Sequence, residues 1–150
     1  MRSVLLSLST LLTVMVAACS DFKDSSYASM ADARRAGAVD RGWLPDLLPD
    51  SAINIRERHN LDTNQTWCAF ELTPAAVATL RSRLSPMKSA DLMNTTVRAP
   101  GARWWPAVLE GRLDPAAIDK AGMSLYTSGS LLFALTSDGR LGFMYRAYAR

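Results

Sequence analysis

The sequence predicts a single small α+β domain, in which a mostly antiparallel sheet of about five strands packs against one main helix. The chain has 150 residues, enough for one hydrophobic core and too few for two. A strand-like run over 66–72 leads directly into a well-capped helix over 74–84. After residue 122, apolar segments alternate with turn sequences, including the hairpin signal Asp138-Gly139.

The first element along the chain has the pattern of an export signal. Arg2 gives it a positive start, and residues 4–18 form an apolar run shorter than the roughly 20 residues of a spanning helix. The run ends in Val16-Ala17-Ala18-Cys19, which resembles the lipobox of bacterial lipoproteins. The alternative is an ordinary signal peptide that happens to precede a cysteine. We expect a lipoprotein signal peptide over 1–18, a lipidated tether over 19–26 and the α+β domain over 27–150.

The lipobox resemblance covers residues 1–19 and implies where the protein resides. Such proteins carry fatty acids such as palmitate on the cysteine, and two acyl chains hold a protein stably on a bilayer. We therefore expect a periplasm-facing protein of the bacterial cell envelope, anchored at Cys19. In enteric bacteria an aspartate directly after that cysteine favours the inner membrane. Ser20 stands there and Asp21 follows it, which favours the outer membrane.

The charge pattern excludes most nucleic-acid roles. The chain has 17 basic and 14 acidic residues, and cleavage would remove only the basic Arg2. The arginines are scattered, with no block of like charge. The expected partners are the membrane, through the anchor, and a protein of the envelope; the sequence leaves the oligomeric state open.

Three elements are expected before residue 60. An alanine-rich stretch over 27–36, followed by Gly37, predicts a helix. The segment 42–49 contains two prolines, which forbid a regular helix or a central strand, so we expect a loop lying on the core surface. The segment 53–59 alternates apolar and polar residues at its start, as an exposed or edge strand does.

The strand over 66–72 contains the second cysteine. Strand periodicity places Cys68, Phe70 and Leu72 on one face. If Cys19 is lipidated, Cys68 has no partner within the chain, so its thiol is buried, paired with another chain, or reactive. Its apolar neighbours on that face favour burial.

The remaining elements are predicted from capping, turn and helix-breaking residues. Thr73 and Pro74 form an N-cap and first turn for the helix over 74–84. Residues 85–103 lack periodicity and predict a long connection that is functional or mobile. The later segments predict a helical turn, a short helix and three strands, over 104–110, 114–121, 123–126, 131–136 and 141–148.

A catalytic hypothesis rests on the only histidine. On a strand, Glu57 and His59 share a face, and Asp62 would reach His59 across the turn. A carboxylate that orients an imidazole suits general-base chemistry, which makes a hydrolytic or small-ligand site the alternative function. However, no serine or cysteine stands in a nucleophile motif such as Gly-x-Ser-x-Gly. The simpler interpretation is an exposed strand end with a hydrogen-bonded turn.

The sequence predicts no metal and no cofactor. Zinc sites need three or four nitrogen or sulfur ligands, and the chain offers one histidine beside a core cysteine. The oxygen ligands Glu57, Asp62 and Asn64 lack the spacing of an EF-hand. No phosphate-binding loop or dinucleotide motif is present.

Three tryptophans are the candidate partner-binding residues. Two adjacent residues of a strand cannot both face one core, so at least one of Trp104 and Trp105 should be partly exposed, although core packing is favoured for the pair. Trp43 is the third, because tryptophan is enriched at binding hot spots.

A second resemblance covers residues 27–72. Gly42-Trp43-Leu44-Pro45, Ser51-Ala52 and Asp62-Thr63-Asn64 are similar to stretches of small uncharacterised Gram-negative envelope lipoproteins. That resemblance implies no activity. The favoured hypothesis is a non-enzymatic binding module, with its contact surfaces at 42–49 and 85–111.

Overall fold

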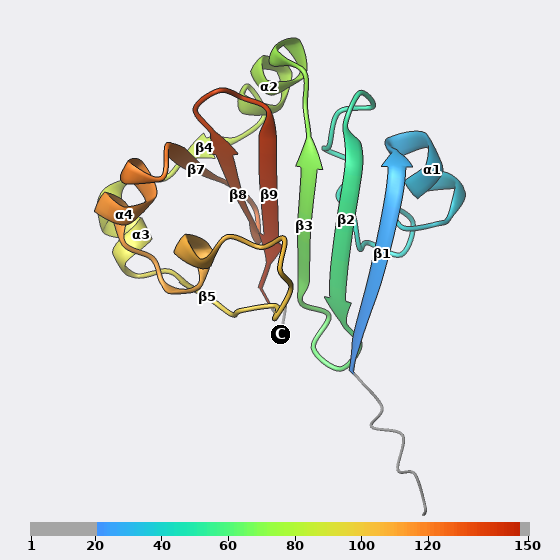
Figure 1. The fold of residues 1–150 in the computed structure, drawn as a ribbon, viewed down its shortest axis with the longest axis horizontal. Coiled ribbons are helices and arrows are strands. Elements are labelled where there is room, and N and C mark those ends of the chain that lie inside the picture. The colour runs from blue at the N-terminus through green and yellow to red at the C-terminus, as the bar shows by residue number, and fades with distance from the viewer. Residues whose placement is uncertain (1–20, 148–150) are drawn as a thin grey trace, which may run out of the picture.

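The computed structural model describes residues 21–147 and contains one large sheet (Figure 1). Its seven strands follow the order β1-β2-β3-β9-β8-β7-β4, and all neighbours pair antiparallel. These strands are β1 Phe22–Ser29, β2 Ile53–Asn60, β3 Thr66–Glu71, β4 Ser85–Pro86, β7 Met123–Ser128, β8 Leu131–Thr136 and β9 Leu141–Arg146. A separate two-stranded sheet joins β5 Thr96–Val97 to β6 Gly111–Arg112.

Five short helices complete the described part: α1 Met30–Arg35, α2 Pro74–Arg81, α3 Ser89–Met93, the 3-10 helix η1 Ala107–Leu109 and α4 Pro115–Lys120. The α+β class and the antiparallel sheet are confirmed. The large sheet has seven strands rather than about five, and no single helix dominates. Between residues 21 and 147, no helix is both long and apolar enough to cross a bilayer.

The helix predicted over 27–36 is present as α1, but its start and the element before it were predicted wrongly. Residues 22–26 belong to β1 rather than to a tether, and the helix starts at Met30 rather than at residue 27. The polar composition of β1 hid it, because its backbone pairs with β2 while none of its residues is fully buried. Ser29 caps the helix, since its hydroxyl accepts the backbone N–H of Asp32. The predicted anchor Cys19 and its neighbour Ser20 lie outside the described residues.

Apolar side chains cover both faces of the sheet, whereas the sequence predicted one covered face. The first core lies between one face and α1, the segment 37–52 and α2. The second core lies between the other face and α3, α4 and the segment 97–113. Strand β3 supplies both: Cys68, Phe70 and the following Leu72 enter the first core, and Trp67 enters the second. The predicted faces of this strand are therefore confirmed.

Helix α2 begins where its capping residues predicted. The Thr73 hydroxyl accepts the backbone N–H of Ala76 at 3.3 Å, and Pro74 occupies the first turn. The helix ends at Arg81, three residues before the predicted end, although Leu84 still packs in the first core. The connection over 85–103 is not irregular throughout, because it contains β4, α3 and β5.

Candidate functional site

The candidate catalytic residues Glu57 and His59 form a buried pair on β2. Both side chains point into the first-core side of the sheet, and His59 Nδ1 lies 2.7 Å from Glu57 Oε1. Glu57 is 1% exposed and His59 3%. The strand period therefore brings the two together as predicted, but in the interior.

The hydrogen-bonded turn expected after this strand is confirmed, but the edge position, the exposure and the contact with Asp62 were predicted wrongly. Strand β2 is not an edge strand, because it lies between β1 and β3. Asp62 is exposed, and no hydrogen bond joins it to His59 in the part of the chain that the structure describes. Asn60 organises the turn instead: its Oδ1 accepts the backbone N–H groups of Asp62 and Thr63 at 3.0 and 2.8 Å. This side chain was not singled out from the sequence, although an asparagine before a turn is a signal for that role.

Trp43 covers the histidine. Its ring stacks on the His59 ring with 4.0 Å between centroids and 17° between planes. The Arg41 guanidinium lies 4.3 Å from the centroid of the same tryptophan ring, a cation–π distance. The Pro/Trp loop thus lies on the core surface, as the prolines predicted, and it closes access to His59.

Burial shifts the pKa values of both residues so that the neutral form of each is favoured. Desolvation raises the pKa of Glu57 to about 8, the nearby charge of Asp24 adds to this rise, and the Ser25 hydroxyl opposes it. Desolvation, together with the positive Arg41 and Lys23, lowers the pKa of His59. Glu57 Oε2 and His59 Nε2 have no hydrogen-bond partner among the described protein groups, which also favours the neutral forms. At neutral pH the pair holds one proton.

This shared proton predicts a pH dependence of stability. From pH 6.5 to about 8 the folded pair keeps its proton, whereas both groups are deprotonated in the unfolded chain, where their ordinary pKa values of 6.5 and 4.5 apply. The unfolded state binds fewer protons, so stability falls as pH rises through this window, by about 2 kcal/mol in total. Below pH 6.5 His59 of the unfolded chain is protonated as well, so this fall is confined to the window above that pH.

Glu57→Gln should abolish this fall, because an amide does not titrate. Urea unfolding followed by tryptophan fluorescence between pH 5 and 9 measures it. Glu71→Gln, at an exposed carboxylate, is the matched control and should keep the wild-type slope. An unchanged slope in Glu57→Gln would refute the shared proton.

Cys68 lies opposite Glu57 on β3 and supplies no nucleophile. The residue is fully buried, and burial together with the Glu57 charge raises the pKa of its thiol well above the usual value. A cysteine nucleophile needs the thiolate, so this thiol is unreactive in the folded protein. The burial predicted for Cys68 is confirmed. Within residues 21–147, no cluster of three His, Cys, Asp or Glu side chains is suited to hold a metal ion.

The structure separates the three candidate tryptophans. Trp105 is buried in the second core, where its ring meets Phe143 edge-on at 5.9 Å. Trp104 is half-buried and contacts Trp105 edge-on at 6.2 Å. One of the two is thus partly exposed, as expected for adjacent residues, and the ring of Trp105 is not available to a partner.

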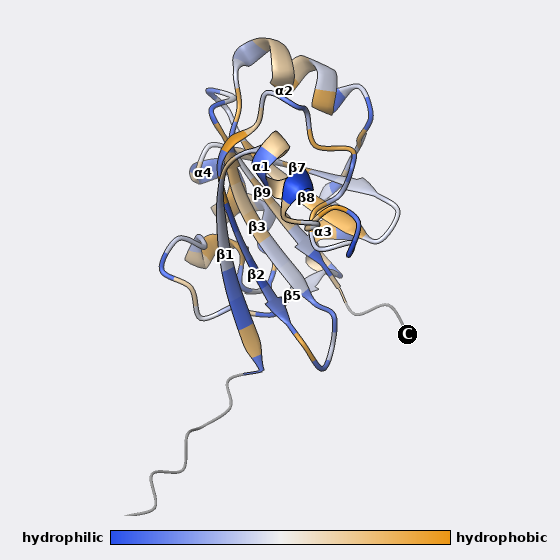
Figure 2. Cartoon of the chain, turned by 90° about the vertical axis from the view of Figure 1, so that its right-hand side faces the viewer, coloured by the Kyte–Doolittle hydropathy of each residue, from blue (hydrophilic) through white to orange (hydrophobic). Residues whose placement is uncertain are grey.

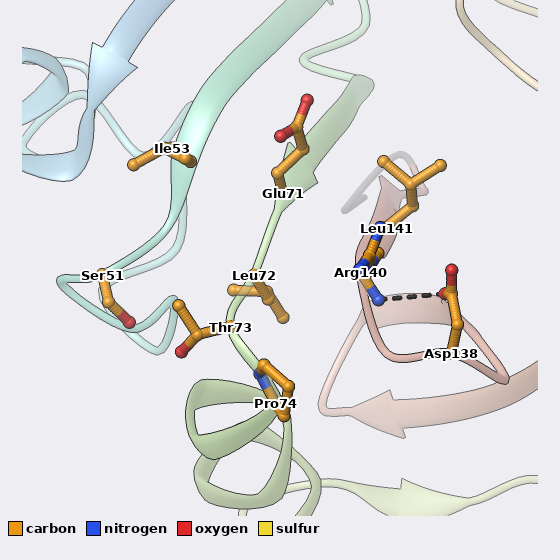
Figure 3. A pocket seen from close by; sticks show the side chains of 9 residues that line it. All are labelled: Ser51, Ile53, Glu71, Leu72, Thr73, Pro74, Asp138, Arg140 and Leu141. Carbon is orange, nitrogen blue, oxygen red and sulfur yellow. Dashed lines mark hydrogen bonds between the residues drawn. The ribbon is translucent and has the colours of Figure 1, made fainter.

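The sequence did not reveal a surface hollow at the end of the sheet near α2 (Figure 3). Its volume is about 560 Å³, and its wall consists of Ser51, Ile53, Glu71, Leu72, Thr73, Pro74, Asp138, Arg140 and Leu141. Ile53, Glu71 and Leu141 are register partners on β2, β3 and β9, and Figure 3 shows Glu71 between the two aliphatic side chains. Ile53 and Leu141 are 45% and 43% exposed. Non-local strand pairing brings these residues together, and a local pattern does not report it.

A tight turn fixes the β9 side of the hollow. Asp138 Oδ1 accepts the backbone N–H of Arg140 at 3.0 Å and the Thr136 hydroxyl at 2.6 Å. The Thr136 hydrogen bond, the largest cause, and the Arg140 N–H lower the pKa of Asp138, so its carboxylate is ionised at neutral pH. The hollow therefore combines an apolar wall with a rim carrying Glu71, Asp138 and Arg140.

Comparison with known proteins gives a match to part of the chain. No curated protein and no solved structure matches it. Residues 21–71 match the family model of the YbbD head domain, about a third of the chain. The matched part spans β1, α1, β2 and β3, and so includes the Glu57–His59 pair, Trp43 and three residues of the hollow. This N-terminal part of the chain is similar to a YbbD head domain.

Proposed function

We propose that this chain is a lipid-anchored protein of the bacterial cell envelope, acylated at Cys19, that binds a partner and has no catalytic role. The signal sequence and lipobox support the anchor, and Ser20 after the cysteine favours the outer membrane. The buried Glu57–His59 pair and the buried thiol favour binding over catalysis, because neither offers an accessible reactive group.

The observation that carries the binding role is the position of the hollow. Strand β1 begins at Phe22, close to Cys19 in the chain, and β2 runs from Ile53 beside the hollow to Asn60 beside the start of β1. Eight strand residues separate the two ends by about 23 Å. Figure 1 shows the start of β1 and helix α2 at opposite ends of the molecule. An anchor at the β1 end would therefore present the hollow, which lies near α2, to the periplasm and away from the bilayer.

The chemistry of the hollow indicates what it binds. The aliphatic side chains of Ile53 and Leu141, which are 45% and 43% exposed, flank the Glu71 carboxylate. Concave surfaces with apolar walls and a few polar groups are typical of binding sites. The occupant that fits is a protein segment that places apolar side chains against Ile53 and Leu141 and a basic one beside Glu71. The surfaces at 42–49 and 85–111 remain the alternative contacts.

Photo-crosslinking in intact cells tests this surface. A benzophenone amino acid replacing Leu141 should give a discrete protein adduct, and Glu71→Lys should remove that adduct because the basic group of the partner is repelled. The matched control is the same probe at Met93 on α3, which is 51% exposed and lies in the alternative region 85–111. An adduct at Met93 alone would move the contact to that region, and an adduct at neither position would refute the binding role of both.

A further inference from the structure

We infer that the end of the sheet opposite the hollow, where β1 begins and the β2–β3 turn lies, rests on an anionic bilayer, with Leu61 inserted among the lipid headgroups. This inference rests on the proposed anchor at Cys19. It adds a second, non-covalent contact and a fixed orientation, which acylation alone does not supply.

Leu61 is held beside the chain that leads to the anchor. It begins the turn between β2 and β3, and its side chain is 50% exposed. Its backbone N–H donates to the Asp21 carbonyl at 2.7 Å. Asp21 is two residues from Cys19, which limits the connecting chain to about 7 Å. The acyl chains and the Leu61 side chain therefore meet the bilayer at the same place.

Basic side chains surround this point. One register row crosses this end of the sheet from β1 to β9, and it consists of Lys23, His59, Thr66 and Arg146. Lys23 is exposed, and Arg146 is half-buried and donates to the Gly42 carbonyl. The exposed Arg41 lies on Trp43 beside this row.

The remaining charges of this end leave an excess of positive charge. Arg98 is exposed and donates to Gln65, in the same turn as Leu61. Asp24 is neutralised by Arg58, which donates to both carboxylate oxygens at 2.7 and 2.5 Å. The exposed acids are Asp21, Asp62 and Asp40, which precedes Arg41 in the chain, against the four cations Lys23, Arg41, Arg98 and Arg146.

This combination matches a lipid surface better than a protein groove. An exposed aliphatic side chain at the tip of a turn inserts without a complementary pocket, and cations beside it are attracted to phosphate headgroups. Figure 2 shows the β2–β3 turn and the start of β1 projecting together at one end of the molecule, with α2 at the other. The large exposed aliphatic residues of the strands are Ile53 and Leu141, and both lie at the opposite end of the sheet, beside the hollow.

Depth-dependent fluorescence quenching tests the orientation. The full acylated protein, carrying an environment-sensitive dye on Leu61→Cys, is reconstituted into phosphatidylglycerol-containing vesicles with a nitroxide quencher on the lipid chains. The buried Cys68 does not react with the dye, and Leu141→Cys serves as the matched control at the far end. We expect strong quenching with a blue-shifted emission at position 61 and only background quenching at position 141.

A charge variant separates insertion from attraction. In the Leu61→Cys protein, Lys23→Gln should weaken the quenching in phosphatidylglycerol vesicles and leave that in neutral phosphatidylcholine vesicles unchanged. Equal quenching at positions 61 and 141 in protein that floats with the vesicles would overturn the orientation while leaving the anchor intact. Protein that does not float with vesicles at all would overturn the anchor and this inference together.

Discussion

Loss of the acylated cysteine should release the protein from the membrane fraction. The variant combines Cys19→Ala with replacement of residues 1–18 by a signal peptide without a lipobox, so that the chain is still exported. Each buried methylene of an acyl chain contributes about 0.8 kcal/mol to membrane attachment, so the removal of two chains costs far more than a few side-chain contacts supply. Flotation of cell envelopes on a density gradient measures the release.

The matched control for this release is Cys68→Ala. It removes the other cysteine, which is buried in the first core, and should leave the protein entirely in the floating fraction. Continued flotation of the Cys19→Ala variant would mean that something other than acyl chains holds the protein on the membrane.

Gly142→Ala should cause a large loss of stability, because an added methyl group has no space at this position of the sheet. Gly142 on β9 is the register partner of Phe70 on β3, and the Phe70 ring lies across its Cα. A Cβ there would fall 2.2 Å from Phe70 Cε2, and Phe70 is 1% exposed in the first core, so its ring has no free space to move into. Overpacking of this kind costs about 1–3 kcal/mol, which urea unfolding resolves.

A double-mutant cycle isolates the cause of this loss. Phe70→Leu removes the ring atoms that Gly142→Ala would meet, so alanine should cost much less in the Phe70→Leu background. The coupling should be at least about 1 kcal/mol. If alanine destabilises both backgrounds equally, the close approach of the ring to Gly142 is not the reason that glycine is required.

Residues with local signals were predicted well. The capping pair Thr73 and Pro74 fixed the start of α2, and the Asp138-Gly139 turn correctly joined β8 to β9. Alternation in β3 assigned Cys68 to the core, because the burial of each residue follows from its immediate neighbours. Each of these signals lies within a few adjacent positions, so packing against distant segments does not alter it.

Elements that depend on distant partners were missed. Strand β1 has too few apolar side chains to be recognised, and it exists because β2 offers it a pairing edge. The burial of Glu57 and His59 depends on Trp43, which lies outside their strand and reaches them only in the folded chain. The hollow likewise needs β2, β3 and β9 in register. Sequence patterns identified the chemical groups of the candidate site and not their accessibility.

The most direct test of the account is the mass of the N-terminal peptide of the native protein, purified from membranes in detergent. A lipid-anchored binding protein requires this peptide to begin at Cys19 and to carry two or three fatty-acyl chains on that residue. A first residue other than Cys19, or a Cys19 without acyl mass, would contradict the anchor and, with it, the placement of the hollow away from the membrane.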